Sequence, residues 1–479
     1  MAGAAFEPIK FGTDGWRAII AEDYTFDNVR ACAQGVAAYL HRAGLAGRGL
    51  LVGYDTRFGS QEFAAAVAEV VAANGIHVYL ADRAAPTPAV SYSIIHRQAA
   101  GAVIITASHN PPQWNGFKYK PDYAGSASPE VIAELEGLIA DAQRSGDIKR
   151  VGLSDAEARG TVTRVDVMTP YLQQIGRLVD LDALRRKPLK IVVDSMHGVG
   201  AGLFAQLLSG GRAEVTELRG ERNPAFPGME QPEPIAHNLQ GLSDAVRASQ
   251  AHVGLATDGD ADRLGVIDEH GRFVTQLQTL ALLALYFLEV RGERGALVKS
   301  IATTSMLFKL GELYDVPVFE TPVGFKYIGP IMIRENALIG GEESGGYGFR
   351  GHIPERDGVL SGLYILSMMA ELDQRPAQLI DYLYSKVGPH HYDRVDLTFD
   401  PGQRQAVQAR LQASEPHELA GTRVSQVDTL DGYRFRLEDG SWSLVRFSGT
   451  EPLLRIYGET SSPERLRRLL NDTRQLTGV

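Results

Sequence analysis

The sequence contains almost no cysteine. Cys32 is the single cysteine among 479 residues, so no internal disulfide can form, and we expect a protein of the reducing cytoplasm. Basic residues are also outnumbered, because 48 Lys and Arg stand against 58 Asp and Glu for a net charge of −10. A nucleic-acid partner needs a basic face, and this balance argues against one. A small anionic substrate stays possible, since a few local Arg and Lys can hold a phosphate.

Long hydrophobic runs are missing as well. The most apolar stretch, Leu277–Val290, is too short to cross a bilayer and predicts a buried helix. The first residues, MAGAAFEPIKFGTDGWR, lack a basic segment followed by an apolar core, so we expect no signal peptide and no membrane partner.

Short β-rich runs alternate with helical segments along the chain. Residues 50–57 predict a strand, 60–75 a helix that ends at Gly75, and 76–81 the next strand. The alternation returns at 189–208, 252–268 and 296–307. It predicts α/β units with largely parallel sheets, whose ligands collect beyond the carboxyl ends of the strands. The chain is too long for one core, and breaks in the pattern predict four domains, the last a smaller α+β unit, at residues 1–160, 161–271, 272–387 and 388–479.

A serine and a histidine follow closely on a predicted buried strand. The apolar run Gly101–Ile105 predicts this strand, and Ser108 and His109 come at its end, in TASHNPPQWNGFKY. Asn110-Pro111-Pro112 then stops regular structure. Either the turn is only a turn, or Ser108 is placed to be reached by a ligand.

Three aspartates occupy alternate positions in TDGDADRLGV. Asp258, Asp260 and Asp262 would point the same way in an extended segment, where they repel one another unless a cation lies among them. Such oxygen ligands suit Mg²⁺. A solvated acidic loop is the plainer alternative, but apolar residues flank the run on both sides. An EF-hand is excluded because Arg263 stands where that loop needs glycine.

Glycine-rich turns with polar side chains occur in four further places. GGEESGGYGF (340–349) combines carboxylates and a hydroxyl suited to sugar hydroxyls, and VRFSGTEPLLRIYGE (445–459) offers hydroxyls, backbone amides and guanidinium for a phosphate. FGTDGWR (11–17) places Arg17 after a turn, and TPVGFKYIG (321–329) does the same for Lys326. Taken one at a time, each could be ordinary turn chemistry.

Together these segments resemble the α-D-phosphohexomutase family, which comprises phosphoglucomutases, phosphomannomutases and their amino-sugar relatives. TASHNPP is similar to the phosphoserine loop of that family, DGDADR to its metal loop, GEESGG to its sugar-binding loop and RFSGTEP to its phosphate-binding loop. The order is preserved over the whole chain. The resemblance implies a mixed α/β fold with four domains around a central cleft, three of them related and the C-terminal one a smaller α+β domain.

The resemblance also implies roles for individual residues. Ser108 would carry a phosphoryl group and complete a Mg²⁺ site with the three aspartates. Lys118 and His109 would assist proton transfer and stabilise charge, Arg263 would lie near the transferred phosphate, and Arg17 would support the phosphoserine. The implied substrate-binding residues are Lys326, Glu342, Ser344, His352, Arg446, Ser448, Gly449 and Thr450.

One departure from the phosphomannomutase-like pattern and one comparison with amino-sugar mutases concern the sugar. Many phosphomannomutase-like members have histidine at the end of the sugar loop, where this chain has Gly346. His352 occurs instead in GHIPERDG, as in phosphoglucomutase-type members, and amino-sugar mutases typically carry glutamine in place of Glu343. These comparisons favour glucose phosphate.

The implied activity is interconversion of glucose 1-phosphate and glucose 6-phosphate, with glucose 1,6-bisphosphate as intermediate and activator. The partner would be a hexose phosphate, bound by a monomer or a small homo-oligomer. Alternatives are a phosphomannomutase or dual-specificity mutase, a hexose 1,6-bisphosphate synthase, a serine-dependent metallophosphatase and a non-catalytic sugar-phosphate-binding protein.

Overall fold

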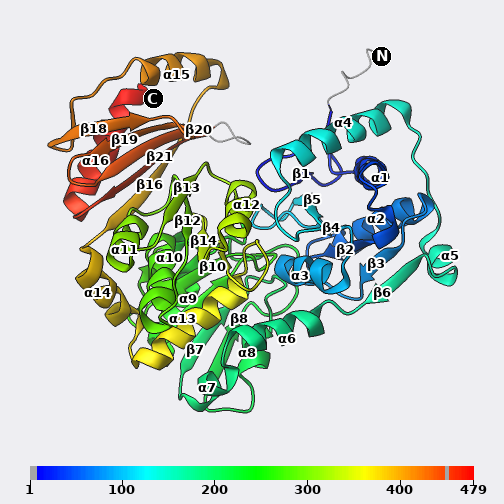
Figure 1. Cartoon of the computed structure of the whole chain (residues 1–479), viewed down its shortest axis with the longest axis horizontal. Helices are drawn as coiled ribbons and strands as arrows, with labels where there is room; N and C mark the ends of the chain where they lie inside the picture. Colours follow the sequence, from blue (N-terminus) through cyan, green and yellow to red (C-terminus); the bar gives the residue numbers. More distant parts are fainter. Residues whose placement is uncertain (1–7, 448–452) are drawn as a thin grey trace.

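The computed structural model describes residues 8–447 and 453–479, which form four sheets, each packed with its own helices (Figure 1). The first sheet is mixed. Its strands β2, β3, β4 and β6 run parallel to one another. At one edge β5 pairs antiparallel with β4, and β1 pairs antiparallel with β5. Its order is β1 (Trp16–Ile19), β5 (Trp114–Pro121), β4 (Gly101–Ile105), β2 (Leu50–Tyr54), β3 (Val78–Ala81) and β6 (Val162–Val165). Its helices are α1 (Phe26–Arg42), α2 (Ser60–Ala73), α3 (Thr87–Arg97), α4 (Pro129–Ser145) and α5 (Leu153–Ala158).

The strands and the helix predicted over residues 50–81 are confirmed as β2, α2 and β3. Every residue of β2 and β4 is buried, which explains their unbroken apolar character. β6 lies past the predicted boundary at residue 160, yet it pairs with β3, so the first sheet extends beyond that boundary.

The second and third sheets follow the same α/β plan. The second has the order β11 (Phe273–Val274), β10 (Leu264–Ile267), β9 (Val253–Thr257), β7 (Lys190–Asp194) and β8 (Glu214–Leu218), with helices α6 (Met168–Leu178), α7 (Leu181–Arg186), α8 (Leu203–Leu208) and α9 (Gln240–Ser249). The third has the order β13 (Val318–Thr321), β12 (Leu297–Ser300), β14 (Ile339–Gly341) and β15 (Tyr347–Phe349). Its helices are α10 (Gln276–Leu285), α11 (Met306–Tyr314), α12 (Phe325–Glu335), α13 (Gly358–Leu372) and α14 (Pro376–Val387).

The helix predicted over Leu277–Val290 is confirmed, with one irregularity. All residues of α10 except Gln278 are buried, and the helix continues as a π-helical turn over Tyr286–Val290. Nowhere in 8–447 or 453–479 does a helix combine the length and the apolar character that a membrane crossing requires.

The C-terminal sheet is antiparallel throughout and stands at the upper left of Figure 1. Its order is β16 (His391–Thr398), β21 (Leu453–Thr460), β20 (Trp442–Phe447), β19 (Tyr433–Leu437), β18 (Thr422–Asp428) and β17 (Glu418–Leu419), with α15 (Arg404–Gln412) and α16 (Pro463–Thr477). This confirms the predicted α+β unit. Its hydrophobic core is separate from the large core that runs through the preceding three units. A small cluster joins it to the third unit, with Ile301 and Ala302 on one side and Trp442, Leu444 and Tyr457 on the other.

Candidate active site

Ser108 lies on a strained turn just after β4. Its φ is +52°, a left-handed conformation that non-glycine residues adopt at a cost of roughly 1–3 kcal/mol and that clusters at functional sites. The side chain of Thr106 supports the turn by accepting a hydrogen bond from the Ser108 amide at 2.8 Å. The Ser108 hydroxyl donates to Oδ2 of Asp258 at 2.9 Å and lies 3.3 Å from Nδ1 of His109. The turn therefore aims the serine at the aspartates.

The three aspartates converge, but not for the reason that their spacing suggested. They lie in the loop between β9 and β10 rather than in an extended segment, and Ala261 turns this loop with a φ of +58°. Oδ1 of Asp258 accepts the backbone amides of Asp262 and Arg263 at 3.0 and 3.2 Å, which curls the loop around one carboxylate. As a result, one oxygen from each aspartate lies within 4.8 Å of the others.

The buried carboxylates have unpartnered oxygens that fit a metal ion. Burial and the charges of Asp260 and Asp262 raise the pKa of Asp258 well above its usual range. Burial would also raise the pKa of Asp260, but Lys118 holds it below its ordinary value. One oxygen each of Asp260 and Asp262 is buried without a hydrogen-bond partner. Unpartnered buried oxygens on clustered carboxylates fit a divalent cation that prefers oxygen ligands, such as Mg²⁺.

Lys118 extends from β5 into this cluster. Its ammonium lies 2.8 Å from Oδ2 of Asp260 and 2.9 Å from Oδ2 of Asp14, and its side chain is buried. Burial alone would lower the pKa of Lys118, but the two carboxylates raise it above its ordinary value. Lys118 is therefore a permanent positive charge beside the aspartates.

Arg356 is a member of this site that the sequence interpretation missed. Its guanidinium lies 2.6 Å from Asp14, 2.9 Å from Asp262 and 3.5 Å from Glu342, so it links the aspartate loop to the glycine-rich loop at 340–349. Its side chain also passes directly over Gly346, where an added Cβ would lie 2.2 Å from Cδ of Arg356. Gly346 is thus required by the path of an arginine that comes ten residues later in the chain.

Three further predicted residues surround Ser108. Arg17 donates to the side chain of Asn110 at 2.6 Å, and Arg263 pairs with Glu233 at 3.1 Å while its Nε lies 3.9 Å from Asp258. Burial, Arg263 and Arg17 lower the pKa of His109 well below its usual range. His109 is therefore neutral near pH 7.

The side chains of the glycine-rich loop at 340–349 point in two directions, one toward Arg356 and the other toward the C-terminal unit. Glu342 is buried and lies near Arg356, and burial raises its pKa. Glu343 points instead to the C-terminal unit, where it accepts from the hydroxyl of Tyr392 at 2.7 Å and pairs with Arg394 at 3.1 Å. Ser344 is partly exposed. Glu343 therefore joins two units in this structure.

His352 and Lys326 are not brought into the same cluster. Nε2 of His352 lies 3.0 Å from Asp357, which also accepts from Tyr171, and the histidine ring stacks on Tyr92 with 5.8 Å between centroids. The His352 side chain is completely buried by these contacts. Lys326 is partly exposed at the start of α12, with its ammonium 5.4 Å from the Tyr327 ring centroid.

Arg446 stands near the end of β20, where its Nε donates to Asp431 at 3.0 Å. The same carboxylate oxygen of Asp431 accepts the amide of Val323, in the segment TPVGFKYIG of the third unit. The other predicted phosphate-binding residues, Ser448, Gly449 and Thr450, lie outside the described residues.

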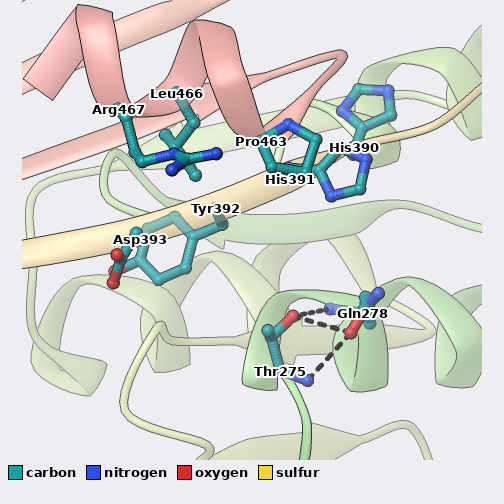
Figure 2. Close-up of a pocket in the computed structure, with 9 residues that line it drawn as sticks. All are labelled: Thr275, Gln278, His390, His391, Tyr392, Asp393, Pro463, Leu466 and Arg467. Atoms are coloured by element: carbon teal, nitrogen blue, oxygen red, sulfur yellow. Dashed lines mark hydrogen bonds between the residues drawn. The ribbon is translucent and has the colours of Figure 1, made fainter.

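A separate pocket of about 340 Å³ opens at the joint between the third unit and the C-terminal unit. Figure 2 shows Thr275, which caps α10, and Gln278 of α10 on one side and residues of β16 and α16 on the other, with the ring of Tyr392 between them. Its lining contains none of the residues predicted for the active site.

Among the missed residues, Asp14 and Arg356 carried a weak signal. Both lie in glycine-containing segments, FGTDGWR and GHIPERDG. Charged residues in such turns are usually solvated, and only the packing of distant segments shows that these two form an ion pair.

Family models describe this arrangement domain by domain. The models for Phosphoglucomutase/phosphomannomutase, alpha/beta/alpha domains I, II and III, match residues 8–145, 169–271 and 276–387, and the model for the C-terminal domain matches residues 402–476. The protein is thus a phosphohexomutase, an enzyme that moves a phosphoryl group on a sugar. The chain belongs to the phosphoglucomutase/phosphomannomutase, or α-D-phosphohexomutase, family. Enzymes of this family depend on Mg²⁺, an ion that the buried aspartates could hold.

The named relatives differ in the sugar phosphate that their names specify. A phosphoglucomutase/phosphomannomutase from Thermococcus kodakarensis is 33% identical over 461 residues, with 96% of each chain covered. A phosphoglucosamine/phosphogalactosamine mutase from Sulfurisphaera tokodaii is 30% identical over 479 residues, which covers 97% of this chain and 98% of the relative. A crystal structure from Thermus thermophilus, provisionally named a phosphomannomutase, is 35% identical with a TM-score of 0.85, covering 99% of this chain and all of the other. These comparisons establish the family, and the names of the relatives include both neutral and amino sugars.

Proposed function

We propose that this phosphohexomutase interconverts glucose 1-phosphate and glucose 6-phosphate through a phosphoserine at Ser108. The observation that carries the proposal is the Ser108 hydroxyl, which is held 2.9 Å from Asp258 by a strained backbone. A free serine hydroxyl is a weak nucleophile and needs activation, whereas a phosphoserine at this position is a ready donor.

The transfer exchanges one P–O bond for another. The phosphoryl group leaves Oγ of Ser108 for the free hydroxyl of the sugar monophosphate, which gives glucose 1,6-bisphosphate, and Oγ gains a proton as the sugar hydroxyl loses one. The other phosphate of the bisphosphate then returns to Ser108, so this molecule serves as intermediate and as activator. Nδ1 of His109, 3.3 Å from Oγ, is placed to exchange the serine proton.

Positive charge around Ser108 would stabilise the transferred group. Lys118 and Arg263 would share its developing charge, and Arg17 would hold the turn through Asn110. Asp258, Asp260, Asp262 and Ser108 would hold Mg²⁺, which neutralises phosphate charge when bound.

The substrate-binding residues come from the third unit and the C-terminal unit. Glu342 and Ser344 would hold sugar hydroxyls, assisted by Lys326, and Arg446 with the segment 448–450 would hold the phosphate that does not react. Because the C-terminal core is separate from the others, this unit could close over the sugar and keep out water, which would otherwise hydrolyse the phosphoserine. The buried contacts of His352 support a positioning role, in which it orients Asp357 at the start of α13.

The preference for glucose rests on the family comparison at Gly346, a position where the path of Arg356 also requires glycine, since Glu343 and His352 make other contacts. One misplaced hydroxyl costs on the order of 1–3 kcal/mol, or roughly ten- to a hundredfold in rate. Parallel assays with glucose 1-phosphate, mannose 1-phosphate and glucosamine 1-phosphate test the proposal. We expect the highest kcat/KM for glucose 1-phosphate and a measurable rate with mannose 1-phosphate. A higher kcat/KM for either other sugar would overturn the glucose assignment.

The same assays separate the related activities. A hexose 1,6-bisphosphate synthase would release the bisphosphate into solution, and a phosphatase would release inorganic phosphate. A mutase converts the monophosphate with neither product accumulating.

A further inference from the structure

Arg57 lies directly beneath the Ser108 turn. It follows β2, and its side chain is completely buried. Its Nη2 donates to the carbonyl oxygens of Ser108 at 2.6 Å and Asn110 at 2.5 Å, and its Nη1 donates to those of Pro111 at 3.0 Å and Trp114 at 3.2 Å. One guanidinium therefore binds four backbone carbonyls of a single short loop.

Arg57 is itself held from two sides. Its Nε lies 3.4 Å from Oδ2 of Asp55, whose other oxygen accepts the backbone amide of Arg57 and the hydroxyl of Ser60. The ring of Phe226, from the second unit, lies 4.9 Å from the guanidinium carbon, at cation–π distance. Burial lowers the pKa of Arg57 to about 10, so its charge persists near pH 7.

The converging carbonyls explain why a planar guanidinium is needed. Carbonyl oxygens that point at one another repel, and Ser108 is already in an unfavourable left-handed conformation. Two separate nitrogens of the planar guanidinium can donate to several oxygens at once, whereas the three donors of a lysine ammonium all radiate from one nitrogen.

The Ser108 carbonyl is also packed against the aspartate loop. An added Cβ on Gly259 would lie 2.5 Å from this oxygen, so the backbones of the two loops are in direct contact. A shift of the Ser108 peptide would therefore move Oγ away from Asp258 and disturb the loop that carries Asp258 and Asp260.

We propose that Arg57 is a positioning residue for phosphoryl transfer, which fixes the Ser108 turn through its four carbonyls and so aims Oγ at the aspartates. This inference rests on the proposed role of Ser108 as phosphoryl carrier. Arg57 acts through the loop backbone and not on the sugar, so its loss should slow the transfer step while leaving sugar binding intact.

The test is Arg57→Lys, which keeps the positive charge and removes the planar guanidinium with its several N–H donors. We expect kcat for glucose 1-phosphate to fall about a hundredfold, the scale of a misplacement near 1 Å, with KM close to that of the wild type. The ³¹P resonance of the phosphoserine should also shift. Arg48→Lys is the matched control, because Arg48 binds the carbonyls of Gln98 and Ala99 in the same unit, away from Ser108. It should leave kcat, KM and the resonance unchanged.

Wild-type kcat and an unshifted resonance in Arg57→Lys would overturn the inference, as would an equal loss of kcat in Arg48→Lys. If Arg57→Lys fails to fold, the inference is tested with Phe226→Leu, which removes the aromatic ring beside the Arg57 guanidinium. A lower kcat with unchanged KM in this variant supports the inference, and wild-type kcat overturns it. Mass spectrometry of the wild-type peptide containing Ser108 comes first, because absence of a transferable phosphate there would defeat the proposed function itself.

Discussion

The hydroxyl of Ser108 donates a hydrogen bond to Asp258 across the boundary between two α/β units, at 2.9 Å. The two residues are 150 positions apart in the chain. The contact sets a candidate phosphoryl carrier beside a candidate metal site, and both assignments can be tested separately.

Ser108→Ala should abolish mutase activity while the fold survives. The substitution removes the atom that would carry the phosphoryl group, so we expect a loss of about a thousandfold or more. Circular dichroism and the melting temperature should stay close to wild type. Ser209→Ala, at an exposed helix end, is the control. Turnover near wild type in Ser108→Ala would exclude the carrier role.

Removal of the metal should have two measurable effects. Chelation should reduce turnover, and added Mg²⁺ should raise the melting temperature of the wild type, because ion binding stabilises the folded state and relieves the repulsion at Asp258. Asp260→Asn should weaken both responses, whereas Asp27→Asn on the exposed face of α1 should keep them. If prolonged EDTA treatment leaves turnover untouched, these aspartates have another role.

The sequence predicted most of what is local in this site. The apolar run at 101–105 and the Asn-Pro-Pro stop fix a strand and a turn around Ser108, because burial and proline act over a few residues. The aspartate cluster was predicted correctly for a wrong reason, since the carboxylates converge through a curled loop rather than along a strand.

The contacts that could not be predicted join distant segments. Lys118 meets Asp14, and Glu343 pairs with Arg394 of the C-terminal unit. The direction of a loop side chain depends on what the rest of the chain packs against it, and local sequence carries little of that information.

Glu343→Gln should weaken the joint between the third unit and the C-terminal unit. The change removes the charge that Arg394 pairs with, so the C-terminal unit would be held less firmly over the sugar and KM for glucose 1-phosphate should rise. Arg394→Gln should raise KM similarly, and the double variant no further, because both single changes break the same contact. Additive effects of the two changes would show that the residues act independently.

Glu320 should make this joint sensitive to acid. Burial alone would raise its pKa, but Arg434 and Lys299 lower it from an ordinary 4.5 to about 2. Glu320 therefore contributes stability above pH 4.5 that is lost as the pH falls toward 2. Glu320→Gln should be destabilised near pH 7 by on the order of 3 kcal/mol.

Urea unfolding between pH 7 and pH 3 checks this pattern. The difference between wild type and Glu320→Gln should shrink as the solution becomes more acidic. Glu438→Gln, which breaks an exposed pair with Arg423, should show a small effect at every pH. A difference for Glu320→Gln that does not change with pH would contradict the assigned ion pairs.

Gly346→Ala should damage the active site through Arg356. The new methyl group would lie 2.2 Å from Cδ of Arg356, so the arginine must leave its place between Asp262 and Glu342. We expect kcat/KM for glucose 1-phosphate to fall about ten- to a hundredfold, which corresponds to roughly 1.4–2.7 kcal/mol of lost transition-state stabilisation. Gly137→Ala is the matched control, since it lies inside α4 with nothing within 4 Å of the added carbon. That variant should be fully active and slightly more stable, because alanine is the better helix former. Wild-type kinetics in Gly346→Ala would show that Arg356 can move aside freely, and that Gly346 does not shape this sugar site.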